Sequence, residues 1–385
     1  MPSPATCNDP AMGEQETLLF LVVVGARFSV PLLIPRFPLP AIVAALVLDG
    51  VDQTIFQLFG YDPPGYQSYD KAMDMFYLSI AYLSAMRNWT SRPAFEVLRF
   101  LFFYRLVGVV LFELTDWRPL LLIFPNTFEY FFIAYEIVRL RWNPARVSRR
   151  DWVLTAAAIW VFVKLPQEWW IHVAQLDVTD TLRAEPWLIP VLILLGLGLA
   201  AGGWFWLRPR LPARVWDWRL AAEPLPDEID TAAERDRWVA AHGRVWSAAT
   251  AEKAVLLGLL CIIYGELLPG RRTTDLELFF GVAVFVLVNA AISMAVARRA
   301  GSVESLLAAF GARVVLNIAM VASAGWLLAR FGGGLDPAAT VFYVLLLTLI
   351  ITLDDRFRPV LQVRFAAGTD RARVSAPLPD RPSGS

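Results

Sequence analysis

The sequence predicts an all-α fold, a polytopic integral membrane bundle of about 11 transmembrane helices. Hydrophobic residues make up 57% of the 385 residues, and the mean hydropathy of +0.50 is far above that of a soluble globular protein. The apolar residues fall into long blocks of roughly twenty residues, the length at which a helix crosses the hydrocarbon layer. The net charge is zero without a basic face, so nucleic acid is not expected as a partner.

Eleven candidate spans follow one another along the chain. They cover residues 17–34, 39–59, 70–89, 94–114, 118–139, 152–175, 187–207, 252–269, 276–297, 303–329 and 337–353. The second and third spans are the least apolar and the richest in acidic residues. Each of the other spans has the composition that favours a helix in lipid.

The longest polar connection, residues 208–251, divides the spans into two groups. We therefore expect a tail over 1–16, a seven-span bundle over 17–207, a loop over 208–251, a four-span bundle over 252–353 and a tail over 354–385. The loop should contain a charged interfacial helix. The last segment is rich in Pro, Ser and Arg, which is typical of a disordered tail.

Arginines in the connections predict the orientation. One set of alternate connections carries 23 arginines and the other set carries 5. Because positive residues favour the cytoplasmic side, the first set should be cytoplasmic. The N-terminus is then outside and the C-terminus cytoplasmic, which requires an odd number of spans.

Composition also indicates where the protein resides. Only three of its 35 basic residues are lysines, and this Arg- and Ala-rich usage is typical of a bacterium with a GC-rich genome. We therefore expect a multi-pass protein of the bacterial plasma membrane, with the lipid bilayer as a partner. Cys7 and Cys261 are the only cysteines, so neither a disulfide framework nor a cysteine metal site is expected. The sequence does not fix the oligomeric state.

The first three spans contain charges that are costly in lipid. Arg27 lies within the first span, where pairing with an acid is favoured over binding a substrate. Asp49 and Asp52 are three residues apart within the second span and share a face. Asp70 and Asp74 open the third span, where the helix dipole gives Asp70 an ordinary explanation. Two such carboxylate pairs on adjacent helices could also hold a divalent cation.

The fourth and fifth spans place further polar groups at depth. Arg105 lies near mid-membrane and requires a partner from another helix. In the fifth span, Asn126, Glu129 and Glu136 follow one another by three and seven residues and share a stripe. Glu129 is the deepest of these acids, which makes it a candidate for an intramembrane carboxylate that takes up and releases a proton.

The sixth span is the most polar one at mid-membrane. Lys164, Glu168 and His172 are spaced by four residues and share a face, to which Gln175 returns. Pro166 removes a backbone donor beside this face. Two readings stay open: a buried Lys–Glu pair that only packs the bundle, or a polar cavity in which Glu168 or His172 binds a proton or a ligand. The seventh to eleventh spans are plainer and indicate helix packing.

Most of the intramembrane polar residues lie in the mid and outer parts of the first six spans. Since ionised groups are costly in lipid, they should line an outward-opening cavity between spans two and six. Glu168, His172 and Glu129 are the expected catalytic or titrating groups. Lys164, Asn126, Arg105 and Gln175 are the expected substrate-binding groups. Asp49, Asp52, Asp70 and Asp74 are the expected metal ligands.

Three functions fit this pattern. The first is a proton- or cation-coupled secondary transporter of a small solute. The second is an integral membrane enzyme that acts on a lipid or isoprenoid-linked substrate with carboxylates, a histidine and a metal. The third is an accessory or structural subunit. The chain contains no GxxxxGK[ST], HExxH, GxSxG or strand-linked GxGxxG motif, so no standard catalytic or nucleotide site is indicated.

Overall fold

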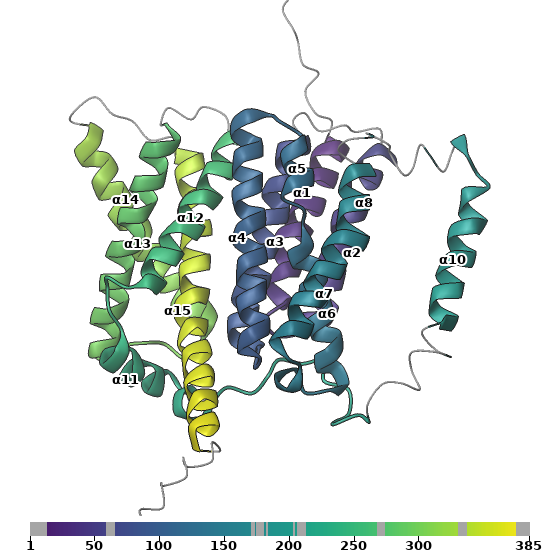
Figure 1. Cartoon of the computed structure of the whole chain (residues 1–385). Coiled ribbons are helices and arrows are strands. Elements are labelled where there is room, and N and C mark those ends of the chain that lie inside the picture. Colours follow the sequence, from purple (N-terminus) through teal and green to yellow (C-terminus); the bar gives the residue numbers. More distant parts are fainter. Residues whose placement is uncertain are drawn as a thin grey trace, which may run out of the picture.

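The protein is an all-helical bundle in the computed structural model (Figure 1). The structure describes residues 14–58, 66–170, 174, 181, 184–202, 205, 213–267, 274–329 and 337–374. Within these residues all regular secondary structure is helical, and helices lie over each of the eleven predicted segments. Four helical stretches are long and apolar enough to cross a membrane, namely Pro119–Arg141, Ala248–Glu266, Asp275–Arg298 and Leu306–Ser323. The chain is therefore a helical membrane protein.

From Glu14 to Glu168, the described residues form ten helical segments apart from the 3-10 turn Pro144–Arg146. They are α1 (Glu14–Ser29), the 3-10 turn Val30–Leu33, α2 (Pro38–Leu58), α3 (Tyr66–Asn88), α4 (Arg92–Thr115), α5 (Pro119–Ile123), α6 (Thr127–Arg141), α7 (Arg149–Ile159), the π-helical segment Trp160–Lys164 and α8 (Leu165–Glu168). Two of the predicted spans are therefore interrupted within their length. The fifth breaks between α5 and α6, and the sixth changes helical pitch between α7 and α8.

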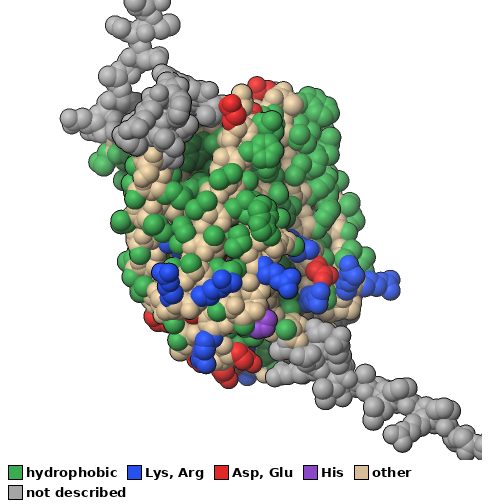
Figure 2. All heavy atoms as spheres, turned by 90° about the vertical axis from the view of Figure 1, so that its left-hand side faces the viewer, with side chains coloured by type: hydrophobic (Ala, Val, Ile, Leu, Met, Phe, Trp, Pro, Cys, Tyr) green, Lys and Arg blue, Asp and Glu red, His purple; other side chains and the backbone are tan. Residues whose placement is uncertain are grey.

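The remaining helices complete the chain. They are α10 (Leu188–Gly202), α11 (Ala232–His242), α12 (Ala248–Leu267), α13 (Asp275–Arg298), α14 (Leu306–Ala329) and α15 (Pro337–Val374). Helix α10 stands apart from the other helices in Figure 1, and its side chains are largely exposed. Figure 2 shows the face on the side of α14: hydrophobic side chains cover its upper part, and a row of Lys and Arg crosses below them.

Helix α3 lies at the centre of the bundle. It packs against helices of both halves, including α4, α12 and α15. Every residue from Ala72 to Met86 is buried. This position explains why the third span is so polar in sequence: a helix surrounded by protein need not present an apolar surface to lipid. Its contacts with α12 and α15 also join the two predicted bundles directly.

Local sequence signals define several helix ends. Pro93 lies in the first turn of α4, where its missing N–H costs no hydrogen bond. The Ser148 hydroxyl accepts from the Asp151 N–H at the start of α7. Thr231 with Glu234 and Thr274 with Glu277 form capping boxes at α11 and α13. The charged helix expected within the loop corresponds to α11, which ends before Gly243.

The predicted tail from residue 354 requires a correction. Helix α15 does not end with the apolar segment at 353 but continues to Val374. The reason is that Phe357, Val360 and Leu361 continue the apolar face at helical spacing and are buried. The polar residues between them carry ion pairs, so the helix extends beyond the apolar stretch instead of fraying.

Helix α11 is fastened to the turn between α13 and α14. The Ala232 N–H donates to Glu304 over 2.5 Å, and Arg235 pairs with the same carboxylate at 3.3 Å. The Asp236 carboxylate accepts from the Ser302 N–H over 3.0 Å. Burial opposes ionisation of Glu304, but the Ala232 N–H and the Arg235 guanidinium outweigh it and lower the Glu304 pKa.

Candidate functional site: a buried polar core

The aspartates of α2 and α3 gather around one arginine of α1. The Arg27 guanidinium pairs with Asp49 and Asp52 of α2. It also lies 3.4 Å from Asp70 Oδ1 and 3.6 Å from Asp74 Oδ1 of α3. Arg27 is only 4% exposed and Asp52 is fully buried. The expected pairing of Arg27 with an acid is thus realised by four acids at once, and we refer to these five residues as the Arg27 cluster.

The expected metal ligands do converge, with a cation of the protein among them. Carboxylate oxygens of Asp49, Asp70 and Asp74 lie within 4.8 Å of one another, a spacing that suits a divalent cation. Asp49 and Asp74 also face the same Arg27 nitrogen, Nη2. A metal at this position would have to share these carboxylates with Arg27. The charge chemistry therefore does not require a divalent cation here.

Arg105 connects the Arg27 cluster to the break in the fifth helix. Its Nη2 lies 3.8 Å from Asp74 Oδ2, and its Nη1 donates to the Phe124 carbonyl over 2.9 Å. That carbonyl is accessible because Pro125 follows it and interrupts the helix. Gly108 of α4 allows this approach, since an added Cβ at Gly108 would overlap the Phe124 side chain.

Glu129 is buried in the first turn of α6 and is held by neutral donors. The Tyr77 hydroxyl donates to Glu129 Oε1 over 2.6 Å. The Asn126 amide donates to Oε2 over 3.2 Å. Within the described residues, Glu129 forms no ion pair, although it is only 2% exposed. Burying a carboxylate without a nearby cation costs free energy unless the carboxylate takes up a proton or binds a cation.

Glu168 of α8 contacts the interruption between α5 and α6 at Asn126. Its Oε1 accepts from the Asn126 N–H over 3.3 Å and lies 3.8 Å from Lys164 Nζ. Lys164 also donates to Gln167 over 3.0 Å and lies over the Tyr130 ring at 4.6 Å. Glu129, Glu168, Lys164, Asn126 and Tyr77 are named the Glu129 cluster. Asn126 contacts both of its glutamates.

The π-helical segment Trp160–Lys164 shapes this second cluster. The Leu165 N–H bonds to the Trp160 carbonyl five residues earlier. Pro166, which has no N–H, follows directly, so the regular hydrogen-bond ladder is disturbed where the sequence predicted it. Segments of this kind are frequent at functional sites. His172 and Gln175, which the sequence placed on the same face, lie outside the described residues.

The two clusters carry more negative than positive charge. In the Arg27 cluster and its neighbours, four carboxylates face three cations, Arg27, Arg105 and Lys71, whose Nζ lies 2.7 Å from Asp70. In the Glu129 cluster, Lys164 lies 3.8 Å from Glu168, and Glu129 forms no ion pair among the described residues. Among the described residues of the two clusters, carboxylates thus outnumber the cationic side chains. Protons or bound cations are the simplest way to neutralise such an excess in a medium of low polarity.

Several buried polar atoms of this core have hydrogen-bonding capacity that the described residues do not meet. They are Asp74 Oδ1, Arg105 Nε, Asn126 Oδ1 and Thr127 Oγ1. Buried polar atoms normally have a partner. Such unmet hydrogen-bonding capacity suits water molecules or a small polar solute. We call the Arg27 and Glu129 clusters with Arg105 and Lys71 the polar core.

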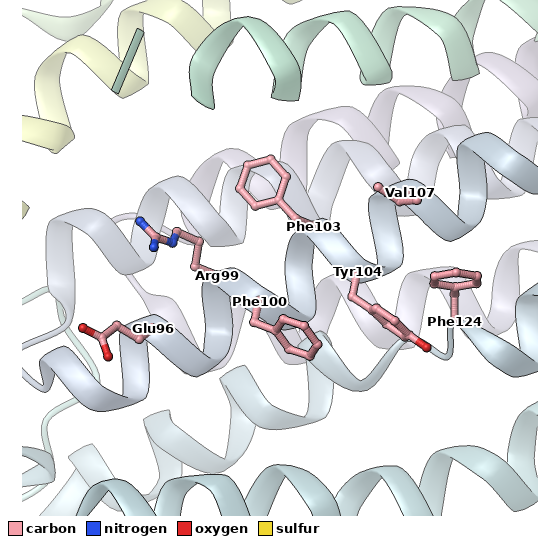
Figure 3. A pocket seen from close by; sticks show the side chains of 7 residues that line it. All are labelled: Glu96, Arg99, Phe100, Phe103, Tyr104, Val107 and Phe124. Carbon is pink, nitrogen blue, oxygen red and sulfur yellow. The ribbon is translucent and has the colours of Figure 1, made fainter. Parts of the chain in front are cut away.

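A shallow groove follows the outer face of α4 near this core (Figure 3). It has a volume of about 470 Å³ and is lined mainly by Phe100, Phe103, Tyr104, Val107 and Phe124. The Tyr104 hydroxyl donates to the Ile123 carbonyl over 2.8 Å and so covers the end of α5. The groove is aromatic and apolar, as expected for a surface that contacts lipid. The outward-opening cavity between spans two and six stays a prediction.

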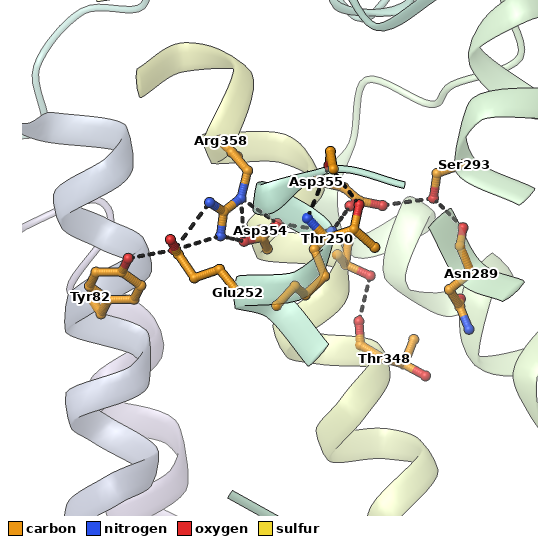
Figure 4. Close-up of polar contacts among 12 residues, drawn as sticks. Tyr82, Thr250, Glu252, Asn289, Ser293, Thr348, Asp354, Asp355 and Arg358 are labelled. Carbon is orange, nitrogen blue, oxygen red and sulfur yellow. Dashed lines mark hydrogen bonds and ion pairs between the residues drawn. The ribbon is translucent and has the colours of Figure 1, made fainter. Parts of the chain in front are cut away.

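The sequence reasoning missed a polar network in the second half (Figure 4). The Tyr82 hydroxyl donates to Glu252 over 2.7 Å. The Arg358 guanidinium lies 3.1 Å from the Glu252 carboxylate and 2.6 Å from the Asp354 carboxylate, and so connects the two acids. Lys253 lies 2.9 Å from Asp354 and also pairs with Asp355. The available signals were Arg313 in the middle of the apolar tenth span and the adjacent pair Asp354–Asp355. Their partners come from helices far apart in the sequence.

Comparison with known protein families, curated proteins and solved structures found no match for this chain. Function is therefore inferred from the chemistry of the polar core.

Proposed function

We propose that this protein is a secondary transporter that moves a small solute through the bundle in exchange for, or together with, protons or monovalent cations. The observation that supports this most is the burial of Glu129, which accepts from Tyr77 and Asn126 and forms no ion pair among the described residues. Intramembrane acids that lack cations are typical of proton and ion pathways. Such an acid suits the uptake and release of a proton or cation during transport.

The interrupted helices support the same function. Transporters commonly bind solutes and ions where membrane helices are broken, because free backbone groups and helix ends then face a polar interior. Here the break at Phe124–Asn126 presents a carbonyl to Arg105 and an N–H to Glu168. In this proposal Glu129 carries the proton or cation, and Arg105, Asn126 and Lys164 bind the polar groups of the solute.

The proposal includes a topology. Eleven spans would place the N-terminus outside and the C-terminus in the cytoplasm, with α11 and the arginine-rich connections on the cytoplasmic side. The unequal distribution of arginines between alternate connections supports this orientation. The bacterial plasma membrane is the expected location.

A flux experiment tests the function. Purified protein in liposomes would receive an imposed proton or sodium gradient together with a panel of small polar solutes. We expect charge or proton movement that depends on one solute class, and its loss in Glu129→Gln. Glu96→Gln is the matched control, because the Glu96 side chain belongs to α4 of the same bundle but is 40% exposed and pairs with Arg92. Absence of gradient-dependent flux across the panel, with folded protein in the liposomes, would overturn the proposal.

The membrane-enzyme alternative is favoured by one observation, the spacing of Asp49, Asp70 and Asp74. A metal-dependent enzyme would alter a lipid extract without vectorial flux, and a chelator would stop the reaction. Asp49→Asn and Asp74→Asn would then abolish turnover while Glu129→Gln would not. The same liposomes therefore separate the two functions.

A further inference from the structure

A second cavity lies between α11 and helices α12 to α15, away from the polar core. Its volume is about 580 Å³. Six basic and three acidic side chains line it, and the basic ones are Arg235, Arg244, Lys253, Arg313, Arg356 and Arg358. The cavity is thus built mainly from cations, in contrast to the acid-rich polar core.

The acidic side chains of this cavity are already occupied. The Asp236 carboxylate accepts from the Ser302 N–H, and Asp354 lies between Lys253 and Arg358. Asp355 accepts from the Ser293 hydroxyl over 2.7 Å and pairs with Lys253 and Arg313. Glu252 and Glu304 do not line the cavity, but they pair with its arginines Arg358 and Arg235. The six basic side chains therefore still exceed these five acids by one. An anionic ligand would balance this excess.

Two arginines can supply unused donors. Arg313 Nη2 donates to Ser293 over 3.0 Å and its Nη1 lies 2.8 Å from Asp355 Oδ2, so part of its five N–H donors stays available for a ligand. Arg313 is the only charged residue of α14, so its place in this apolar helix calls for a strong partner. Arg244 lines the cavity and forms no ion pair in the part of the chain that the structure describes. Guanidinium groups are well suited to bind phosphate oxygens.

The other walls of the cavity are apolar and adjoin the lipid-facing surface. Ile292, Val296, Leu306 and Leu316 line it. Leu307 and Val315 on α14 are 78% and 70% exposed. Figure 2 shows this side of the bundle, with apolar side chains above a row of Lys and Arg. Such a boundary marks the interface between hydrocarbon and lipid headgroups, as does the 80% exposed Trp246 two residues beyond Arg244.

We propose that this cavity binds the phosphate headgroup of an anionic phospholipid from the adjacent membrane leaflet. Arg244 and Arg313 hold the phosphate oxygens, and the acyl chains lie along α13 and α14. The ligand class follows from the combination of excess cations, the Arg244 guanidinium that forms no ion pair among the described residues, and an apolar wall at the membrane interface. A soluble phosphate shares the headgroup chemistry but would gain nothing from the apolar wall.

Lipid binding to the purified full-length protein tests this site. Native mass spectrometry would follow the titration of detergent-solubilised protein with phosphatidylglycerol, phosphatidylcholine or inorganic phosphate. We expect discrete binding of phosphatidylglycerol at least about tenfold tighter than that of the other two, which corresponds to one charge-assisted contact. Arg244→Gln and Arg313→Gln should each weaken that binding by about tenfold.

Arg237→Gln is the matched control, because Arg237 lies on the same helix as Arg235 but is exposed and does not line the cavity. If Arg313→Gln fails to fold, exposed Arg244 still provides the test. Equal binding of phosphatidylcholine, binding of inorganic phosphate as tight as that of phosphatidylglycerol, or an equal loss in Arg237→Gln would each overturn the proposal.

Discussion

The backbone N–H of Asn126 donates to the Glu168 carboxylate over 3.3 Å. This single bond connects the break in the fifth helix to the irregular part of the sixth. It also places Glu168 beside Lys164, at 3.8 Å, in a setting where both side chains are almost fully buried.

Variants of the Lys164–Glu168 pair test whether the pair only stabilises the fold or also takes part in transport. Lys164→Met should destabilise the protein by roughly 3–5 kcal/mol, because it leaves a buried carboxylate without its cation. The double variant Lys164→Met with Glu168→Gln should recover at least about 1 kcal/mol relative to the sum of the single changes. Thermal unfolding in detergent measures both. Transport should stay lost in the double variant; its return would make the pair purely structural.

Arg27 should be the most sensitive cation of the bundle. Arg27→Gln leaves four aspartates facing one another, and we expect a loss of roughly 3–5 kcal/mol in unfolding free energy. Asp52→Asn in the same chain should restore part of this loss, because it removes one uncompensated charge. Arg36→Gln serves as the control, since Arg36 is exposed. Similar unfolding midpoints for Arg27→Gln and Arg36→Gln would contradict the arrangement of the Arg27 cluster.

The close approach of α4 to the helix break predicts a strong effect at Gly108. An added methyl group would overlap the Phe124 side chain. We expect Gly108→Ala to lower stability by roughly 1–3 kcal/mol, the usual cost of overpacking. It should also displace the Phe124 carbonyl from Arg105 and reduce transport. Gly281→Ala in α13 meets no atom within 4 Å and should be neutral or mildly stabilising.

The attachment of α11 should depend on pH through Glu304. Because the folded-state pKa of Glu304 is lowered from 4.5, its ionised form stabilises the attachment above that pH. This contribution is lost as the pH falls through the folded-state pKa. Hydrogen exchange of residues 232–242, corrected for intrinsic rates, should therefore rise on acidification below about pH 4.5. Glu304→Gln should show the faster exchange already at pH 7, without the acid transition.

Cysteine labelling checks the orientation. In a variant that lacks Cys7 and Cys261, a new cysteine at Ala240 on α11 should react only after the cell is made permeable. A cysteine at Ala184, in the connection after the sixth span, should react with an impermeant reagent in intact cells. Both alanines are exposed. Labelling in the opposite order would invert the proposed topology.

Part of the candidate site could be predicted from sequence because it depends on local spacing. Asp49 and Asp52 share a face by their separation of three residues, and Lys164 and Glu168 by their separation of four. The cost of charge in lipid predicted that such groups turn inward. Spacing within one helix could not show that Arg27 stands at the centre of the aspartates, or that Tyr77 reaches Glu129 from another helix.

The second-half network shows the same limit. Lys253 meets Asp355 across 102 positions in the sequence, and each residue alone resembles an ordinary charge near a span end. Helix α3 was misjudged for another reason: its polar sequence gave no sign that it would be enclosed by other helices at the centre of the bundle. Hydropathy reports contact with lipid, so a helix enclosed by other helices is recognised only when its neighbours are known.

The π-helical segment Trp160–Lys164 has a mechanical consequence. It accommodates an additional residue, so its relaxation to regular α-helical pitch would rotate everything beyond it by about 100°. Such a turn would swing the Glu168 side chain away from the Asn126 N–H and toward another sector of the bundle. We therefore expect this segment to let the second part of the helix rotate, so that Glu168 exchanges one set of neighbours for another without any unfolding of its helix.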